Sequence, residues 1–194
     1  MRTLAMLLSA FFVSVVFAIP QDTTWSDVAT YDDAEAYRVY STILPEELPW
    51  RQADVKTLVI RRETEPHAMC IEPNKESKKI VGAAIADYKK RNEKKWLLGK
   101  QFDIAKPYEM ISGDEIDAVF KTGWKTFYQR HPGSDGWIEL SAVGFNASKT
   151  VAVAYAGHFC GSLCSGGGSF HILQKVSGKW IPFLKGGDFC SWVP

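Results

Sequence analysis

The last third of the chain alternates short apolar runs with turn residues, and this pattern constrains the fold more than any other feature. The runs begin near Trp137, Thr150 and Ser169, and the segments between them are rich in Gly, Asn and Ser. Runs of this kind between turn residues are typical of consecutive strands in an antiparallel sheet. Ser177-Gly178 is a two-residue hairpin signal. The pattern therefore predicts an antiparallel meander of about three to five strands.

The run 150–159 is apolar on both faces, which predicts a central strand. Side chains alternate across a strand, so Val and Tyr at 151, 153 and 155 share one face, and Ala at 152, 154 and 156 share the other. The small alanine side chains would let a helix lie close to that face. His158 follows on the alanine face, where we expect a packed, hydrogen-bonded histidine.

The rest of the chain adds helices and at least one strand before the meander. Apolar periodicity predicts helices over 32–44 and 77–97, with Gly99 just past the end of the second. A capping box at Ser112–Glu115 predicts a third helix through Lys121. We expect a strand over 56–64, an extended segment over 102–110, and an aromatic cluster followed by a turn over 124–136. This order predicts an α+β fold, with N-terminal helices packed on a C-terminal antiparallel sheet.

The first 18 residues predict a secretory signal peptide. Arg2 precedes an apolar run from Leu4 to Phe17, and Ala18 supplies a small residue for cleavage. The run is shorter than the roughly 20 residues that a membrane span needs. We expect a single domain over residues 19–194, secreted or periplasmic, with no membrane span after cleavage. The formal net charge is +1, and Arg2 contributes one of those charges, so nothing favours nucleic acid as a partner.

All four cysteines lie after the predicted cleavage position. An even number of cysteines in an exported chain predicts two disulfides. Three pairings are open, and we favour Cys160–Cys164 with Cys70–Cys190. The longer link would stabilise the fold, whereas the shorter one would mainly fix the shape of one loop.

Several pieces of the C-terminal third resemble one known family. The strings G-W-I-E-L-S-A-V-G-F-N, A-V-A-Y, C-G-S-L-C-S-G-G and G-K-W-I are similar to the C-terminal half of a family of exported bacterial proteins with no established activity. In that family a Cys-Gly-x-Leu-Cys motif is followed by glycines, whereas Ser165 stands here directly after the second cysteine. The resemblance implies export and a shared fold, and it implies no catalytic residue.

The glycine-rich loop from Cys160 to Gly168 is the candidate contact surface, because function concentrates on loops that a rigid scaffold holds. We expect it to contact an unknown protein or small-molecule ligand. The candidate residues of this loop and its flanks are His158, Gly161, Ser162, Ser165, Gly166, Gly167 and His171. The sequence predicts no catalytic residue, since no histidine is paired with a nucleophile. It also predicts no metal and no cofactor.

Two alternatives use the same segment. Two cysteines and two histidines, Cys160, Cys164, His158 and His171, could bind zinc tetrahedrally, but an exported cysteine pair normally oxidises and its sulfurs then become poor ligands. The chain could instead be a small exported hydrolase or metal-dependent enzyme that uses His158 and His171. The leading hypothesis remains a non-catalytic binding or accessory protein.

Overall fold

A computed structural model describes residues 28–45, 55–70, 73–161, 166–183 and 191–192. Four helices lie in these ranges: α1 (Ala34–Ile43), α2 (Lys75–Arg91), α3 (Gly113–Thr122) and α4 (Trp124–Arg130). The strands are β1 (Thr30–Tyr31), β2 (Leu58–Arg61), β3 (Leu97–Leu98), β4 (Tyr108–Ile111), β5 (Trp137–Leu140), β6 (Gly144–Phe145), β7 (Val151–Phe159), β8 (Gly167–Val176), β9 (Lys179–Pro182) and β10 (Ser191–Trp192). None of the helices in this part of the chain combines the length and the apolar character needed to cross a bilayer.

The main sheet is larger than the predicted meander and is not purely antiparallel. Its eight strands include the path β10-β8-β7-β5-β2-β4, with β6 beside β7 and β9 beside β8. Strands β5, β7, β8 and β9 pair antiparallel, as the sequence predicts, but β2 pairs parallel with both β4 and β5. The prediction of a sheet confined to the C-terminal segment, with three to five strands, is wrong. Parallel neighbours need long crossovers, and these contain α2, α3 and α4.

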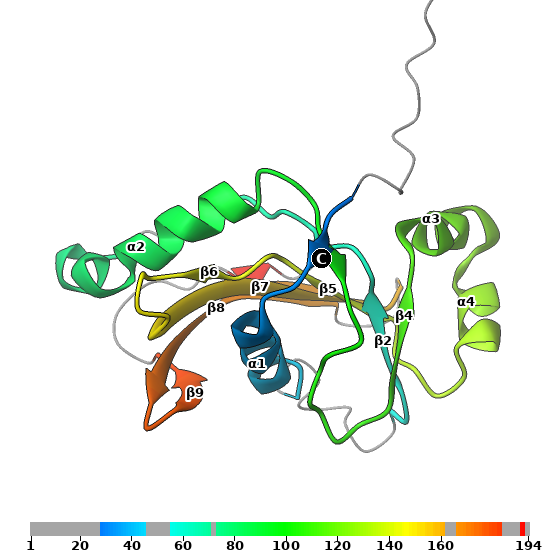
Figure 1. The fold of residues 1–194 in the computed structure, drawn as a ribbon. Helices are drawn as coiled ribbons and strands as arrows, with labels where there is room; N and C mark the ends of the chain where they lie inside the picture. Colours follow the sequence, from blue (N-terminus) through cyan, green and yellow to red (C-terminus); the bar gives the residue numbers. More distant parts are fainter. Residues whose placement is uncertain (1–27, 46–54, 71–72, 162–165, 184–190, 193–194) are drawn as a thin grey trace, which may run out of the picture.

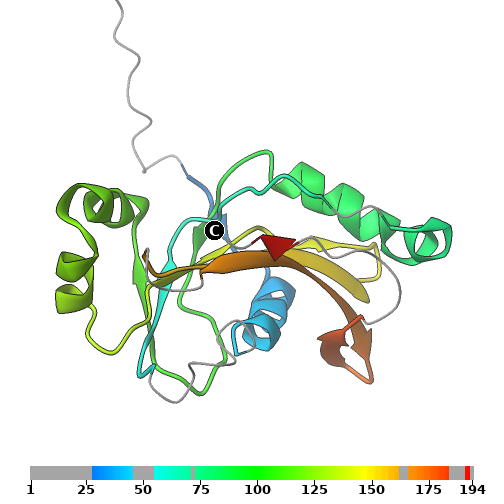
Figure 2. The same ribbon diagram turned by 180° about the vertical axis from the view of Figure 1, so that it is seen from behind.

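Helices cover both faces of the sheet. Figures 1 and 2 show α1 and α2 on opposite sides of β7 and β8, with α3 and α4 together beyond the end of the sheet at β4. The alanines at 152, 154 and 156 share a core cluster with α1, which includes Tyr37 and Tyr40. The opposite face packs on α2. Helix α1 thus shares a core with the alanine face, but the helix that comes closest to β7 is α2, on the opposite face, so the expected close approach at the alanines is not confirmed.

The predicted helices are present, with differences at their ends. Asn74 caps the start of α2, and Asn92 ends that helix before the predicted end near Gly99. Ser112 and Glu115 form the predicted capping box at the start of α3. The sequence did not predict α4, which is seven residues long and has no side-chain cap at its start. Short helices without caps give little local signal.

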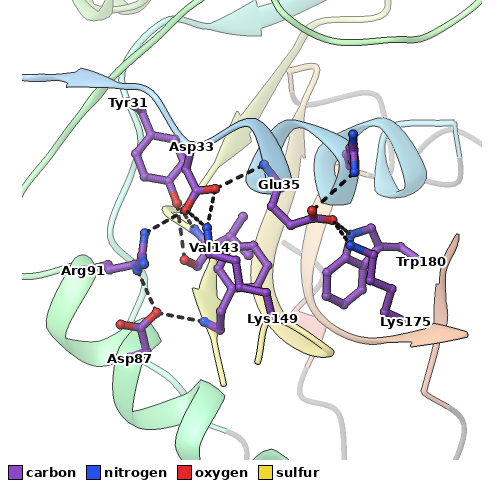
Figure 3. A network of polar contacts seen from close by, with 11 residues as sticks. Tyr31, Asp33, Glu35, Asp87, Arg91, Val143, Lys149, Lys175 and Trp180 are labelled. Carbon is purple, nitrogen blue, oxygen red and sulfur yellow. Dashed lines mark hydrogen bonds and ion pairs between the residues drawn. The ribbon is translucent and has the colours of Figure 1, made fainter. Parts of the chain in front are cut away.

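A polar network joins segments that are far apart in the chain (Figure 3). The carboxylate of Asp33, at the start of α1, lies 2.9 Å from Lys149 Nζ and 3.4 Å from Arg91 Nη1. Burial alone would raise the pKa of Asp33, but Lys149, the backbone N–H of Glu35 and Arg91 together outweigh it and lower the pKa. Glu35 accepts hydrogen bonds from Lys175 and from the indole of Trp180. The network ties α1 to α2, to the turn before β7 and to the β8–β9 hairpin, so its role is structural.

Candidate functional site

His158 lies near the end of β7, buried beside Asp135, in the segment before β5, and Cys160, at the start of the glycine-rich loop. Its Nε2 contacts the backbone carbonyl oxygen of Asp135, and its Nδ1 lies 3.8 Å from Cys160 Sγ. Period-two alternation places it on the alanine face, four per cent exposed. The prediction of a packed, hydrogen-bonded histidine at this position is confirmed.

Asp135, His158 and Cys160 each offer a ligand atom, and these atoms lie within 4.8 Å of one another. A metal would need Cys160 as a thiolate. Cys160 is not a free thiol, and neither is Cys70. The group therefore lacks its sulfur donor. Asp135 and His158 alone supply one oxygen and one nitrogen, whereas a structural zinc site uses four ligands.

The structure does not bring His158 and His171 together. His158 is opposite Gly167 in the register of β7 and β8, whereas His171 is opposite Ala154. The two histidines share a face, but four residues of β8 separate their positions, which is about 13 Å along the strand. His171 Nε2 instead lies 3.1 Å from the hydroxyl of Ser169. A single catalytic or metal centre that uses both imidazoles would need a rearrangement of the sheet.

The predicted contact loop is only partly described. Ser162, Cys164 and Ser165 lie outside the described residues, as does Cys190, so neither the loop's shape nor the predicted pairing is tested. Gly161 has φ +89° and lies against the indole of Trp124. Gly166 lies next to Cys160, since a Cβ there would be 3.7 Å from the sulfur. The two ends of the loop are therefore close together at the entry to β8, which begins at Gly167 rather than at Ser169.

A buried ionic network, which the sequence analysis missed, lies on the face of the sheet that α2 covers. Arg61 Nη1 lies 3.0 Å from Glu139 Oε1, and Arg61 Nη2 lies 2.5 Å from Glu65 Oε1. Arg61 Nε is 3.6 Å from Glu63, and Lys95 also contacts Glu65. Three carboxylates thus share two cations. The side chain of Arg61 is 13% exposed and that of Glu63 is 3% exposed.

His67 lies at the edge of this network. Its ring stacks on Tyr155 with centroids 3.7 Å apart, and its Nε2 lies 3.9 Å from Glu139 Oε2. Burial alone would raise the pKa of Glu139, but His67, Arg61 and the Trp137 indole outweigh it and lower the pKa. A buried carboxylate beside an imidazole is an arrangement that general bases use. However, no hydroxyl or thiol in the described ranges donates a hydrogen bond to His67, so the pair has no partner for nucleophilic catalysis there.

An apolar cavity of about 450 Å³ opens between the end of α1, the start of β2 and the segment before β4. Leu44, Val55, Leu58 and Ile104 line it together with two prolines and an alanine, and Lys56 and Lys106 also line it. Its volume falls in the range of about 300–1,000 Å³ that is typical of small-molecule sites. No local sequence signal could have revealed it, since its walls come from three separate segments.

The cavity adjoins the predicted site. A second space, too narrow for a water molecule, is lined by Val55 and Leu58 on one side and by Ile138, Asp135 and His158 on the other. Val55 and Leu58 therefore separate the cavity from His158. A ligand in the cavity would lie one layer of side chains away from the start of the glycine-rich loop.

Comparisons with protein families, with curated proteins and with solved structures gave no match. The resemblance to an exported bacterial family therefore stays a prediction. The function has to be argued from the geometry of the chain itself.

Proposed function

We propose that the chain is an exported, non-catalytic binding domain that takes up a small apolar ligand in the cavity beside α1 and β2. The observation that carries this proposal is the 450 Å³ cavity, with its apolar wall and two polar groups. Concave, largely apolar sites with a few polar side chains are the usual form of small-molecule sites. The position of His158 behind Val55 and Leu58 would couple ligand uptake to the predicted contact loop.

The rival proposal, a small hydrolase or metal-dependent enzyme built on His158 and His171, has less support. The register separates the two imidazoles by about 13 Å along β8. Cys160 is not available as a thiolate. His67 and Glu139 form the best acid–base pair among the described residues, but no hydroxyl or thiol in that part of the chain donates a hydrogen bond to His67. Binding is therefore the simpler proposal.

Apolar ligand uptake can be tested with 1-decanol, a neutral single-chain alcohol, by isothermal titration calorimetry. We expect saturable binding of one molecule per chain with a negative heat-capacity change, because apolar surface is buried. Ala105→Trp should weaken binding at least about tenfold, because Ala105 is an exposed residue of the cavity wall and a bulky ring would fill the space. Ala147→Trp, in an exposed turn before β7, is the matched control and should bind as the unchanged chain does. Absence of saturable binding by the unchanged chain would contradict the proposal.

We also propose that export removes residues 1–18, that the chain is secreted or periplasmic, and that disulfides Cys160–Cys164 and Cys70–Cys190 stabilise it. Support comes from the even number of cysteines after residue 18 and from the absence of a free thiol at Cys70 and Cys160. We expect the purified exported protein to begin at Ile19 and to contain no free thiol before reduction. Intact mass and a thiol count measure both. Four free thiols with stoichiometric zinc would instead favour the metal-dependent alternative.

A further inference from the structure

We infer that the ligand of the cavity is a single-chain carboxylic acid, an anionic amphiphile whose chain enters the cavity and whose carboxylate stays at the rim beside Lys56. This inference rests on the proposed function and adds the chemical class of the ligand. The observation behind it is the charge of the cavity wall. Of the described residues that line the cavity, two are lysines and none is acidic.

The local charge differs from that of the whole chain, which has 23 basic and 22 acidic residues. Elsewhere in the described structure, cations lie beside acidic side chains: Arg61 touches three carboxylates, and the more exposed Arg91 and Lys149 share Asp33. Among the described residues of the cavity wall, both charged side chains are lysines. That arrangement is complementary to an anion.

Both lysines that line the cavity also make contacts with the backbone. Lys106 Nζ donates a hydrogen bond to the carbonyl oxygen of Val55, which also lines the cavity. The backbone N–H of Lys56 donates to the carbonyl of Gly133 at 2.7 Å, and a Cβ at Gly133 would lie 3.1 Å from the Lys56 Cβ. Lys56 is exposed, and no acidic side chain in the described ranges forms an ion pair with it. Its ammonium can therefore reach a carboxylate at the rim while staying in contact with water.

The apolar part of the wall accounts for the other half of the ligand. Leu44, Val55 and Leu58 are each at most 6% exposed, and Ile104 is partly buried. Such a wall offers no hydrogen-bond partner for a sugar or a nucleotide, both of which would lose hydration without compensation. An alkyl chain gains about 0.8 kcal/mol for each methylene that it buries. A long-chain acid can bury its alkyl chain against the apolar wall and pair its carboxylate with Lys56. A small polar anion can only pair with Lys56.

The test compares decanoate with 1-decanol, which have equal chain length and differ in the head group, on the mature, disulfide-intact protein at pH 8. We expect decanoate to bind about two- to fivefold more tightly than 1-decanol, since an ion pair that stays exposed to water contributes little. Lys56→Gln should remove most of this preference, because it should weaken decanoate binding more than 1-decanol binding. Lys179→Gln, at an exposed position of β9, is the matched control and should change neither affinity. Raising the salt concentration should weaken decanoate binding only.

The outcomes separate this inference from the proposed function. If both compounds bind equally well and Lys56→Gln has no effect, the proposed function stands and the carboxylate inference is wrong. If neither binds, both are wrong. The chain's own residues 46–54 connect two cavity residues, Pro45 and Val55. If binding is seen only after Leu48 and Trp50 are replaced by serine, the cavity belongs to the chain itself, and that result also overturns the inference. Circular dichroism of each variant shows whether it is folded.

Discussion

Replacing Arg61 by methionine is expected to destabilise the fold by about 3–5 kcal/mol, the usual cost of removing one partner from a buried ionic network. The arginine contacts Glu63, Glu65 and Glu139 within 3.6 Å. Methionine keeps much of the apolar stem but removes the charge. Lys95 would then be the one cation left among three carboxylates in the described network, and burial of unpaired charge is costly.

Urea unfolding followed by fluorescence or circular dichroism measures this effect. The control is Arg38→Met, which removes a surface ion pair to Glu35 whose arginine side chain is 67% exposed. Exposed pairs contribute about 0–1 kcal/mol. If the two variants lose equal free energy of unfolding, the buried network does not stabilise the sheet in the way that its geometry suggests.

The pH dependence gives a second readout of the same network. The folded-state pKa of Glu139 lies below its usual value of 4.5. Its contribution to stability is therefore present above about pH 4.5 and is lost as the pH falls through the lower folded-state pKa. Without Arg61 this pKa should rise, because one cause of its lowering is gone. We expect the stability difference between the unchanged chain and Arg61→Met to narrow as the pH falls below 4.5. A constant difference would indicate that lost packing, and not charge, explains the effect.

The ionic network also shows what the sequence could have revealed. Arg61, Glu63, Glu65 and His67 occur at every second position, and this spacing places their side chains on one side of an extended segment. Charged residues in that pattern, directly after the apolar run Leu58–Ile60, indicate that one side of the segment contacts other charged or polar side chains. Their partner Glu139 could not be found in this way, because it reaches the network through the parallel pairing of β2 with β5.

The accuracy of the other predictions depended on how local their causes are. The start of α3 was predictable because Ser112 and Glu115 satisfy each other's neighbouring backbone groups within four residues. The two faces of β7 were predictable because successive side chains of a strand point to opposite faces, and larger and smaller residues alternate along its first part. The positions of β2 and β4 in the sheet were not, since four-residue strands are too short to show which strand they will pair with. The cavity depends on the packing of three such segments, so it was not predictable either.

Replacing Gly144 by alanine is expected to destabilise the chain by about 3 kcal/mol or more, for a reason that lies in the contact between α2 and β6. A Cβ at position 144 would come closer than 3.0 Å to the backbone N of Tyr88 and to the backbone O of Ala84. These are main-chain atoms of a helix, which cannot turn away as a side chain can, so the whole helix would have to move. Overpacking of a well-packed core usually costs about 1–3 kcal/mol, and displacement of a helix that covers one face of β7 should reach or exceed the upper end.

Gly82→Ala, on the same helix, provides a control with the opposite sign. Its added Cβ would meet only Lys78 Cγ, at 3.7 Å, an ordinary contact. Because glycine in the middle of a helix costs about 0.5–1 kcal/mol relative to alanine, this variant should be more stable than the unchanged chain. Urea unfolding of both variants measures the pair of effects. A loss for Gly144→Ala no larger than about 0.5 kcal/mol would contradict the close packing of α2 on β6 and, with it, the position of the helix above β7.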